Sequence, residues 1–447
     1  MKRPAALLVV IVAAAAPRLV AFFALGDRLL EPRQDQMLFA ELAAGAASGR
    51  GLALDPARFA AKTAAWREPA LAPWVREPGW VFGLIPVGRK TSAYEPLYPY
   101  TTAGFLRVGV PPWAAARLVN VIWGVAAAVA AYAAAWYLAG RRAALATGLA
   151  AALYPAYIYY GFLAMGETAH LGLLALTVAA FYAAFASENA AAAVPFGLAA
   201  GAFVLTRAIG LPVFILLTGY GLVFYKTRRR AGVAAVAVAT FAAALTPWLI
   251  RNAAVHGDLV VLPTRGGVNL WMRNNPRVLA LEPGELGRER WQDIWPTLKR
   301  PDLLSYPDFG PAGEVERDRM LRARMTAFIR ANPRYFAAAC GRRFVALVRP
   351  YGPQLKSPWA KAANVIPYGL AIIGGVWGFV IAARRRYARR AWPLLLVFLF
   401  YVAYHSVVHG GVRYRLPADI MLLILAGNVF AAATPPARRN FARSQEN

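Results

Sequence analysis

Long apolar runs recur along most of this chain of 447 residues, separated by short polar or basic stretches. An α-helix rises about 1.5 Å per residue, so roughly 20 apolar residues are needed to cross the hydrocarbon core of a bilayer. The pattern predicts an all-α integral membrane protein with about ten transmembrane helices. The predicted spans are 5–25, 113–139, 143–163, 168–186, 191–207, 211–225, 232–250, 363–383, 391–408 and 416–434.

Two long segments, 26–112 and 251–362, separate the predicted spans and are too polar to cross a membrane. Both are expected to be extracytoplasmic loops that carry amphipathic helices. In the second loop Leu321, Met325 and Phe328 recur at helical spacing with arginines between them, which is typical of a helix on a membrane surface. Residues 1–434 are expected to form a single transmembrane domain that includes both loops, and 435–447 a cytoplasmic tail.

The basic residues of the short loops predict the orientation of the spans. With the helix count above, all five basic clusters fall on one side of the membrane, which the positive-inside rule makes the cytoplasmic side. Both termini are then cytoplasmic, and the chain is a multi-pass protein of the cytoplasmic membrane. The first apolar run resembles a signal peptide, but its length and the spans that follow favour an uncleaved helix. The clusters lie at 2–3, 141–142, 226–230, 384–390 and 438–443.

Composition supports a membrane protein and excludes other classes. Hydrophobic residues make up 59% of the chain and the mean hydropathy is +0.42, whereas soluble domains contain about 45–50% apolar residues. The net charge of +28 would suit nucleic acid, but the basic residues lie between apolar segments and in loops, so nucleic-acid binding is not expected. Cys340 is the only cysteine, so no intramolecular disulfide can form.

Acidic residues near the predicted outer helix ends are candidates for catalysis. Asp35 begins an amphipathic stretch after the first span, where it either caps a helix or serves as a general base. Glu167 lies in a short turn between the third and fourth spans, as a favourable charge at a helix start or as a second catalytic carboxylate. Glu95 and Tyr98 are candidates for substrate contact. His170 alone makes no metal site, so no metal-binding residues are assigned, and a divalent ion is left open.

Arginines gather at the same outer helix ends. Guanidinium groups suit phosphate oxygens because they bind them with two parallel hydrogen bonds. The alternative is that these side chains reach towards lipid head groups. Arg18 differs because it lies inside the first span, where a charge requires a partner that the sequence does not identify. The four candidates for substrate binding are Arg207, Arg251, Arg413 and Arg415.

The order of short motifs resembles that of a known family. It begins with Asp35 after the first span, Pro-Leu-Tyr-Pro at 96–99, Gly-Glu-Thr at 166–168 and Leu-Thr-Arg at 205–207. From about residue 5 to 420, the ordered set resembles bacterial protein O-mannosyltransferase-like membrane glycosyltransferases of the GT-C superfamily. The later motifs are Thr-Pro-Trp-Leu-Ile-Arg-Asn at 246–252, Gly-Gly-Val-Asn-Leu-Trp-Met-Arg-Asn-Asn-Pro at 266–276 and Arg-Tyr-Arg-Leu-Pro at 413–417.

The resemblance implies an inverting transfer of a sugar from a polyprenyl-phosphate donor to an acceptor hydroxyl of a glycan, lipid or protein at the outer face. Asp35 matches the family's base. The family often has Asp-Glu there, whereas this chain has Asp35-Gln36 and its next acid is Glu41. Relatives also carry an arginine before Pro-Leu-Tyr-Pro, where this chain has 93–95 Ala-Tyr-Glu. Segment 51–90 matches no part of the family that we can align.

A single base is sufficient for this chemistry, because polyprenyl phosphate leaves without protonation while arginines stabilise its charge. Two rival functions remain. A transporter or flippase of lipid-linked glycans would carry charged residues inside several helices, where this chain offers Arg18. A lipid-glycan ligase or polymerase would rely on outer arginines and histidine more than on a first-loop base.

The predicted topology can be tested with reporter fusions. Fusions after Arg142, Arg230 and Arg390 should report a cytoplasmic position, and fusions near Ser92 and Gly310 an extracytoplasmic one. Paired alkaline phosphatase and fluorescent-protein fusions measure both outcomes, since each is active on one side only. A cytoplasmic signal at Gly310 would contradict the helix count and the side assigned to every site residue.

Overall fold

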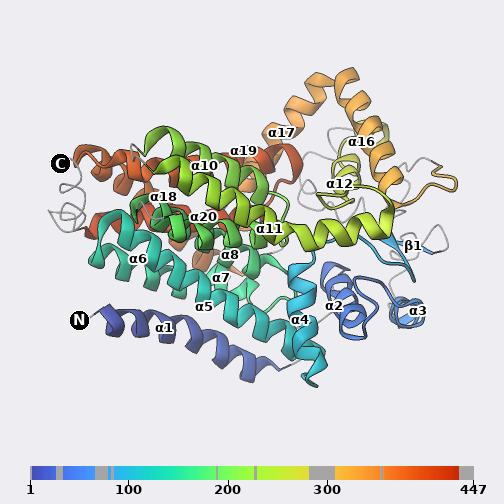
Figure 1. Ribbon diagram of the computed structural model, residues 1–447, viewed down its shortest axis with the longest axis horizontal. Helices are drawn as coiled ribbons and strands as arrows, with labels where there is room; N and C mark the ends of the chain where they lie inside the picture. Colours follow the sequence, from blue (N-terminus) through green and yellow to red (C-terminus); the bar gives the residue numbers. More distant parts are fainter. Residues whose placement is uncertain are drawn as a thin grey trace.

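The structure is a computed structural model, and it is almost entirely helical in the part that it describes (Figure 1). The strands β1 (Trp80–Val81) and β2 (Ile85–Pro86) form one antiparallel pair. The described residues are 3–26, 34–65, 79–81, 85–187, 190–225, 229–280, 308–352, 355 and 357–431.

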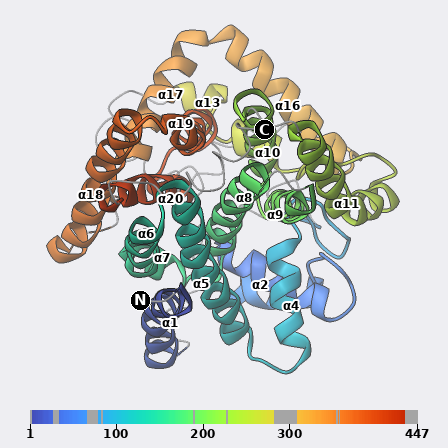
Figure 2. The ribbon, with the colours of Figure 1, turned by 60° about the vertical axis from the view of Figure 1, so that its left-hand side comes forward.

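A bundle of roughly parallel helices forms the body of the molecule (Figures 1 and 2). Within the described residues each of the ten predicted spans contains helical structure, which confirms an all-α membrane protein; the last three residues of the tenth span, 432–434, lie outside the described part. Within the described ranges, six helices are long and apolar enough to cross a bilayer: α1, α5, α8, α11, α18 and α19. The bundle consists of α1 (Arg3–Leu25), α5 (Pro112–Ala139), α6 (Arg141–Leu153), α7 (Pro155–Tyr160), α8 (Glu167–Ser187), α9 (Ala193–Val204), α10 (Gly210–Phe224), α11 (Arg230–His256), α18 (Pro358–Arg384), α19 (Ala388–Val408) and α20 (Val412–Ala426).

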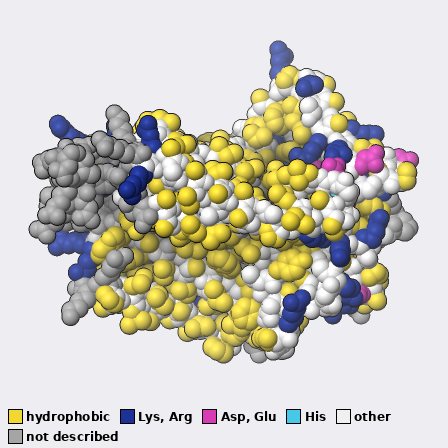
Figure 3. Space-filling model, in the orientation of Figure 1, with side chains coloured by type: hydrophobic (Ala, Val, Ile, Leu, Met, Phe, Trp, Pro, Cys, Tyr) yellow, Lys and Arg dark blue, Asp and Glu magenta, His cyan; other side chains and the backbone are white. Residues whose placement is uncertain are grey.

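Apolar side chains cover the visible flank of this bundle, and basic side chains gather towards its ends (Figure 3). Phe23 and Ile373 are 77% and 70% exposed, which would be costly in water and is favourable in lipid. At one end the start of α6 contacts the short helix η4 (Gly427–Phe430), and Arg385 binds the carbonyl of Ala431. The basic short loops after α5 and α18 therefore lie at the same end, as the charge pattern predicted.

The predicted span 143–163 is interrupted. Pro155 has no N–H to donate, so α6 ends at Leu153 and α7 begins a separate short helix. The buried Arg18 of α1 finds its partner at this break, where its guanidinium donates to the carbonyl of Ala152 at 3.0 Å. It also donates to Ala14 on its own helix at 2.7 Å. The break in one helix thus supplies a carbonyl acceptor to the guanidinium group of another, whose Nε forms no hydrogen bond with the described residues.

The two long loops fold as helices at the opposite end of the bundle (Figure 1). The helix predicted around Leu321 is α16, although Leu321 and Phe328 pack against Trp271 of α12 rather than facing lipid. Glu41 of α2 pairs with Arg58 of α3 at 3.1 Å, so this ion pair connects the first two helices of the first loop. Part of segment 51–90 lies outside the described residues. The loop helices are α2 (Gln34–Ala47), α3 (Pro56–Ala65), α4 (Leu97–Arg107), α12 (Gly266–Trp271), α13 (Pro276–Ala280), α16 (Glu314–Ala331) and α17 (Pro333–Val348).

Helix α20 lies inside the bundle, and close backbone contact with α18 holds it there. A methyl group on Gly378 would overlap the carbonyl of Leu425, so we expect Gly378→Ala to push the helices apart at a cost of ~1–3 kcal/mol. The measurement is the thermal unfolding midpoint in detergent, which should fall. Gly369→Ala is the matched control on α18, because nothing lies within 4 Å of its added methyl group. Equal midpoints for the two variants would contradict this packing.

Candidate active site

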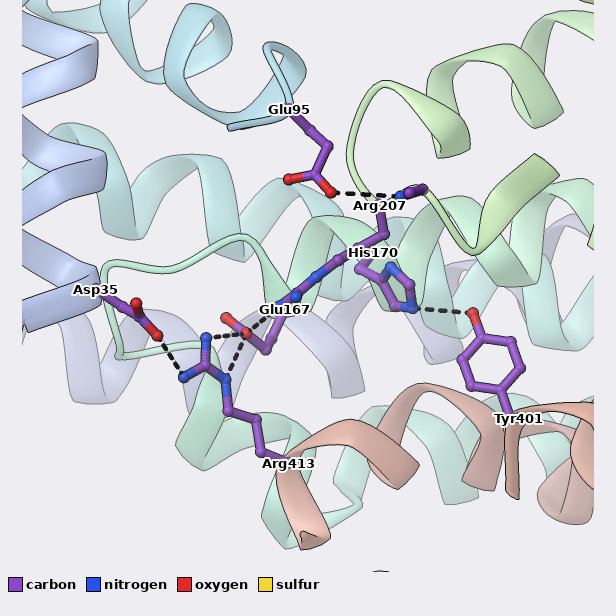
Figure 4. Close-up of polar contacts among 8 residues, drawn as sticks. Asp35, Glu95, Glu167, His170, Arg207, Tyr401 and Arg413 are labelled. Atoms are coloured by element: carbon purple, nitrogen blue, oxygen red, sulfur yellow. Dashed lines mark hydrogen bonds and ion pairs between the residues drawn. The ribbon is translucent and has the colours of Figure 1, made fainter. Parts of the chain in front are cut away.

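Four charged residues that are far apart in the sequence meet where the bundle joins the loop helices (Figure 4). Asp35 stands in the first turn of α2, and Glu167 is the first residue of α8. Arg413 lies in the first turn of α20, and Arg207 follows α9. All four were candidates from the sequence, and each is at or near a helix end, where a charged side chain can leave the apolar bundle.

The guanidinium of Arg413 bridges the two acids. Its Nη1 donates to Asp35 Oδ2 at 2.8 Å, and its Nη2 lies 2.5 Å from Glu167 Oε1. The Nη2 of Arg207 donates to the same Glu167 oxygen at 2.5 Å. Glu167 is buried, whereas 35% of the Asp35 side chain remains exposed. We call these four residues the ionic cluster; of its two acids, Asp35 is the more accessible.

The surrounding arginines determine the charge of Asp35. Burial alone would raise the pKa of its carboxyl, but Arg413, Arg265 and Arg207 outweigh this effect and hold the pKa below its ordinary value. Asp35 is therefore ionised at neutral pH. Its position in the first turn of α2 also suits the helix dipole, so stabilising the helix and accepting a proton are compatible roles.

Glu95 and Tyr98 lie beside the cluster without entering it. Glu95 Oε1 accepts a hydrogen bond from the backbone N–H of Ala208 at 3.3 Å, next to Arg207 (Figure 4). This bond fixes the turn that carries Arg207. Tyr98 is buried and packs against Gly166, the residue before Glu167.

Arg251 and Arg415 are bound elsewhere. Arg251 donates to Ser92 Oγ at 2.8 Å and stacks over Trp248, with its guanidinium carbon 4.6 Å from the ring centroid. Arg415 is 1% exposed and pairs with Asp419 at 2.9 Å within α20. The sequence patterns did not single out Asp419, which is a further charged residue buried inside the bundle.

The acids of the cluster do not form a metal centre in this structure. No three His, Cys, Asp or Glu side chains of the described ranges are grouped as ligands of one ion, and Arg413 fills the space between the two acids. His170 donates to or accepts from the hydroxyl of Tyr401 at 2.9 Å and packs on Phe203 (Figure 4). The residues present therefore do not fit a divalent ion held by three protein side chains.

A small void of about 10 Å³, with room for about one water molecule, adjoins Glu167. It is lined by Tyr157 and Tyr160 of α7, Leu171 of α8 and Leu416 of α20. Apolar and charged groups thus meet at Glu167.

We predict that Arg413 is the main electrostatic support of the cluster. Arg413→Met should destabilise the protein by ~3 kcal/mol, because removing one partner leaves a buried carboxylate less well compensated. Arg413→Lys should recover only part, since lysine lacks the planar fork. The thermal unfolding midpoint reports both effects. Arg319→Met is the control, because Arg319 pairs with Asp258 on the exposed surface and such pairs contribute little. An equal loss in both variants would contradict the prediction.

No protein-family model and no curated protein matches the chain. Solved structures do match. The oligosaccharyltransferase of Archaeoglobus fulgidus, in complex with Zn and sulfate, aligns with a TM-score of 0.54 and 14% identity over 94% of this chain and 48% of that chain. The same protein, AglB, in complex with an inhibitory peptide and a dolichol-phosphate aligns with a TM-score of 0.54 and 14% identity, over 95% and 49% of the two chains.

ArnT from Cupriavidus metallidurans bound to undecaprenyl phosphate also matches, with a TM-score of 0.43 and 16% identity over 95% of this chain and 77% of that chain. The chain spans about half the length of the archaeal oligosaccharyltransferase. At this level of identity the likeness concerns the fold. The chain therefore shares its fold with the archaeal oligosaccharyltransferase over nearly its whole length, in agreement with the GT-C fold that the ordered motifs predicted.

Proposed function

We propose that this protein is an inverting membrane glycosyltransferase that moves a sugar from a polyprenyl-phosphate donor to an acceptor hydroxyl. The ionic cluster is the observation that carries the proposal. It provides an ionised, partly accessible carboxylate beside two arginines, at the loop end of a GT-C fold. The dolichol-phosphate bound by AglB belongs to the same chemical class as the proposed donor, which supports a lipid-linked substrate.

In this mechanism the carboxylate of Asp35 accepts the proton of the acceptor hydroxyl. The acceptor oxygen forms a bond to the anomeric carbon as the bond from that carbon to the phosphate oxygen breaks. Polyprenyl phosphate leaves with the electron pair and needs no proton at neutral pH. The single displacement inverts the anomeric centre.

Arg413 and Arg207 have two tasks in this reaction. Their guanidinium groups compensate Glu167 in the ligand-free protein, and they are available to stabilise the charge that develops on the leaving phosphate. An arriving phosphate competes with Asp35 for Arg413, which frees the carboxylate to act as a base. We assign Arg251 and Arg415 to more remote roles because they bind Ser92 and Asp419.

The proposed reaction takes place at the extracytoplasmic face of the cytoplasmic membrane, with a glycan, lipid or protein as acceptor. The transporter alternative requires charges inside several helices that a substrate can reach. Arg18 and the Arg415–Asp419 pair are buried and bonded to their own neighbours, which favours a structural role for them. A ligase or polymerase would depend less on a base in the first loop, so replacing Asp35 distinguishes this alternative from the proposed transferase.

Replacing the base tests the proposal. Asp35→Asn keeps the size of the side chain and removes its negative charge, so it should yield a folded protein that binds donor and transfers ~10²–10⁴ times more slowly. Glu167→Gln should slow transfer less if this acid only positions the arginines. Membranes that contain the native donor and acceptor, assayed for sugar transfer, measure both.

The two variants also serve as controls for each other, because they alter acids of the same cluster. Thermal unfolding midpoints separate a loss of chemistry from a loss of folded protein. If Asp35→Asn transfers sugar at the wild-type rate and Glu167→Gln is inactive, the base is Glu167 and not Asp35. Wild-type transfer by both would reject a carboxylate base at this site.

A further inference from the structure

Arg415 stands in the same turn of α20 as Arg413 but points away from it, because two positions in a helix differ by about 200°. Its side chain is buried, and the mechanism above gives it no task. A buried guanidinium inside a membrane bundle is costly unless its donors are used. The partners of Arg415 therefore indicate what this side chain holds in place.

The carbonyls at the end of α17 are the first partners. Arg415 Nη1 donates to the carbonyl of Leu347 at 2.8 Å and to that of Arg349 at 2.6 Å. The last carbonyls of a helix lack partners within the helix and carry partial negative charge, so a guanidinium group suits them. Arg415 thus fastens the end of α17, the last helix of the second loop, to the start of α20.

Side chains of the bundle hold the guanidinium in this position. Its Nε donates to Asp419 Oδ1 at 2.9 Å, one turn further along α20, and its central carbon lies 3.5 Å from the ring centroid of Tyr368 on α18. Asp419 Oδ2 in turn accepts a hydrogen bond at 3.5 Å from the hydroxyl of Tyr154, which lies between α6 and α7. The planar fork of Arg415 is therefore fixed from several helices at once.

The turn of α20 that carries Arg413 needs support from outside the helix. Gly411 precedes it with a φ of +145°, a conformation that favours glycine, and Pro417 has no N–H for the carbonyl of Arg413 four residues earlier. The turn is therefore less firmly joined to the chain on either side than a turn of a regular helix. Arg413 binds acids of α2 and α8, and Arg415 binds α17, so these two side chains fix the turn from opposite directions.

We infer that Arg415 is a positioning residue, which holds Arg413 between Asp35 and Glu167 by anchoring the first turn of α20 to the carbonyls that end α17. The described contacts of Arg415 include neither of these acids, so it acts through Arg413. The inference deepens the proposed function, on which its consequence for sugar transfer rests. The geometry concerns Arg413 and Asp35 alone and can be measured without substrate.

The protonation of Asp35 reports where Arg413 stands. Burial raises the pKa of the Asp35 carboxyl, and Arg413, together with two further arginines, lowers it below its ordinary value. If Arg413 moves away, burial remains and one compensating charge is lost, so the pKa should rise. The other groups that act on Asp35 are Arg265, Arg207, Glu167 and Tyr94.

The test titrates Asp35 by infrared spectroscopy on the full-length protein in detergent. Subtracting the spectrum of the matching Asp35→Asn variant isolates the band of this carboxyl. Arg415→Gln cannot reach both carbonyls of α17, so the titration midpoint of Asp35 should rise by about one to two pH units. Arg415→Lys should restore only part of the shift, since lysine lacks the planar fork. As the pH falls, sugar transfer by Arg415→Gln should be lost at a higher pH than in wild type, because the base must be ionised.

Gly378→Ala is the matched control, because it loosens α20 at Leu425, away from the turn that carries Arg413. It should lower the thermal unfolding midpoint and leave the titration of Asp35 as in wild type. If Arg415→Gln behaves in the same way, Arg415 is only a structural residue and the inference is overturned. If the unpaired Asp419 prevents folding, Arg415→Gln combined with Asp419→Asn removes both charges and carries the same comparison.

A double substitution tests whether Arg415 acts through Arg413. In an Arg413→Met background, Arg415→Gln should move the titration of Asp35 no further, and an additional shift would reject this route. The base and the positioning role can also fail separately. Normal transfer by Asp35→Asn would reject the proposed base, whereas a raised Asp35 midpoint in Arg415→Gln would still support the positioning role. An unchanged midpoint together with an inactive Asp35→Asn would reject the positioning role and retain the base.

Discussion

The guanidinium of Arg413 lies between the carboxylates of Asp35 and Glu167, and this contact joins the start of α20 to the starts of α2 and α8. In a protein surrounded by lipid, charges are costly unless they are paired or reach water. Arg413 lies at the end of the bundle, where it pairs with both acids. Arg207 forms a second ion pair with Glu167. The site therefore also holds these helices together. For Asp35 to act as a base, its bond with Arg413 would have to break.

Much of this cluster could be predicted from the sequence, because its members follow a simple rule. Asp35, Glu167, Arg207 and Arg413 are charged residues next to apolar runs, and helices of bilayer length bring such residues to a common level. The ordered motifs of the GT-C family added the expectation that they belong to one site. The all-α fold followed from the same periodicity.

Other residues could not be placed because their partners depend on tertiary packing. Arg415 stands two residues after Arg413 and looks equivalent in the sequence, but α20 turns it by about 200° into the bundle, where Asp419 binds it. The interruption of the third predicted span was foreseeable from Pro155, whereas its use by Arg18 was not.

The bond between Arg18 and the Ala152 carbonyl has a consequence for biogenesis. During synthesis α1 leaves the ribosome more than a hundred residues before its acceptor, since these two residues are separated by 134 positions. A central arginine in an isolated span costs ~2.5–3.5 kcal/mol on insertion scales. Until α6 has been synthesised, Arg18 cannot reach this acceptor, so part of the stabilisation of the first helix comes only when α6 packs against it.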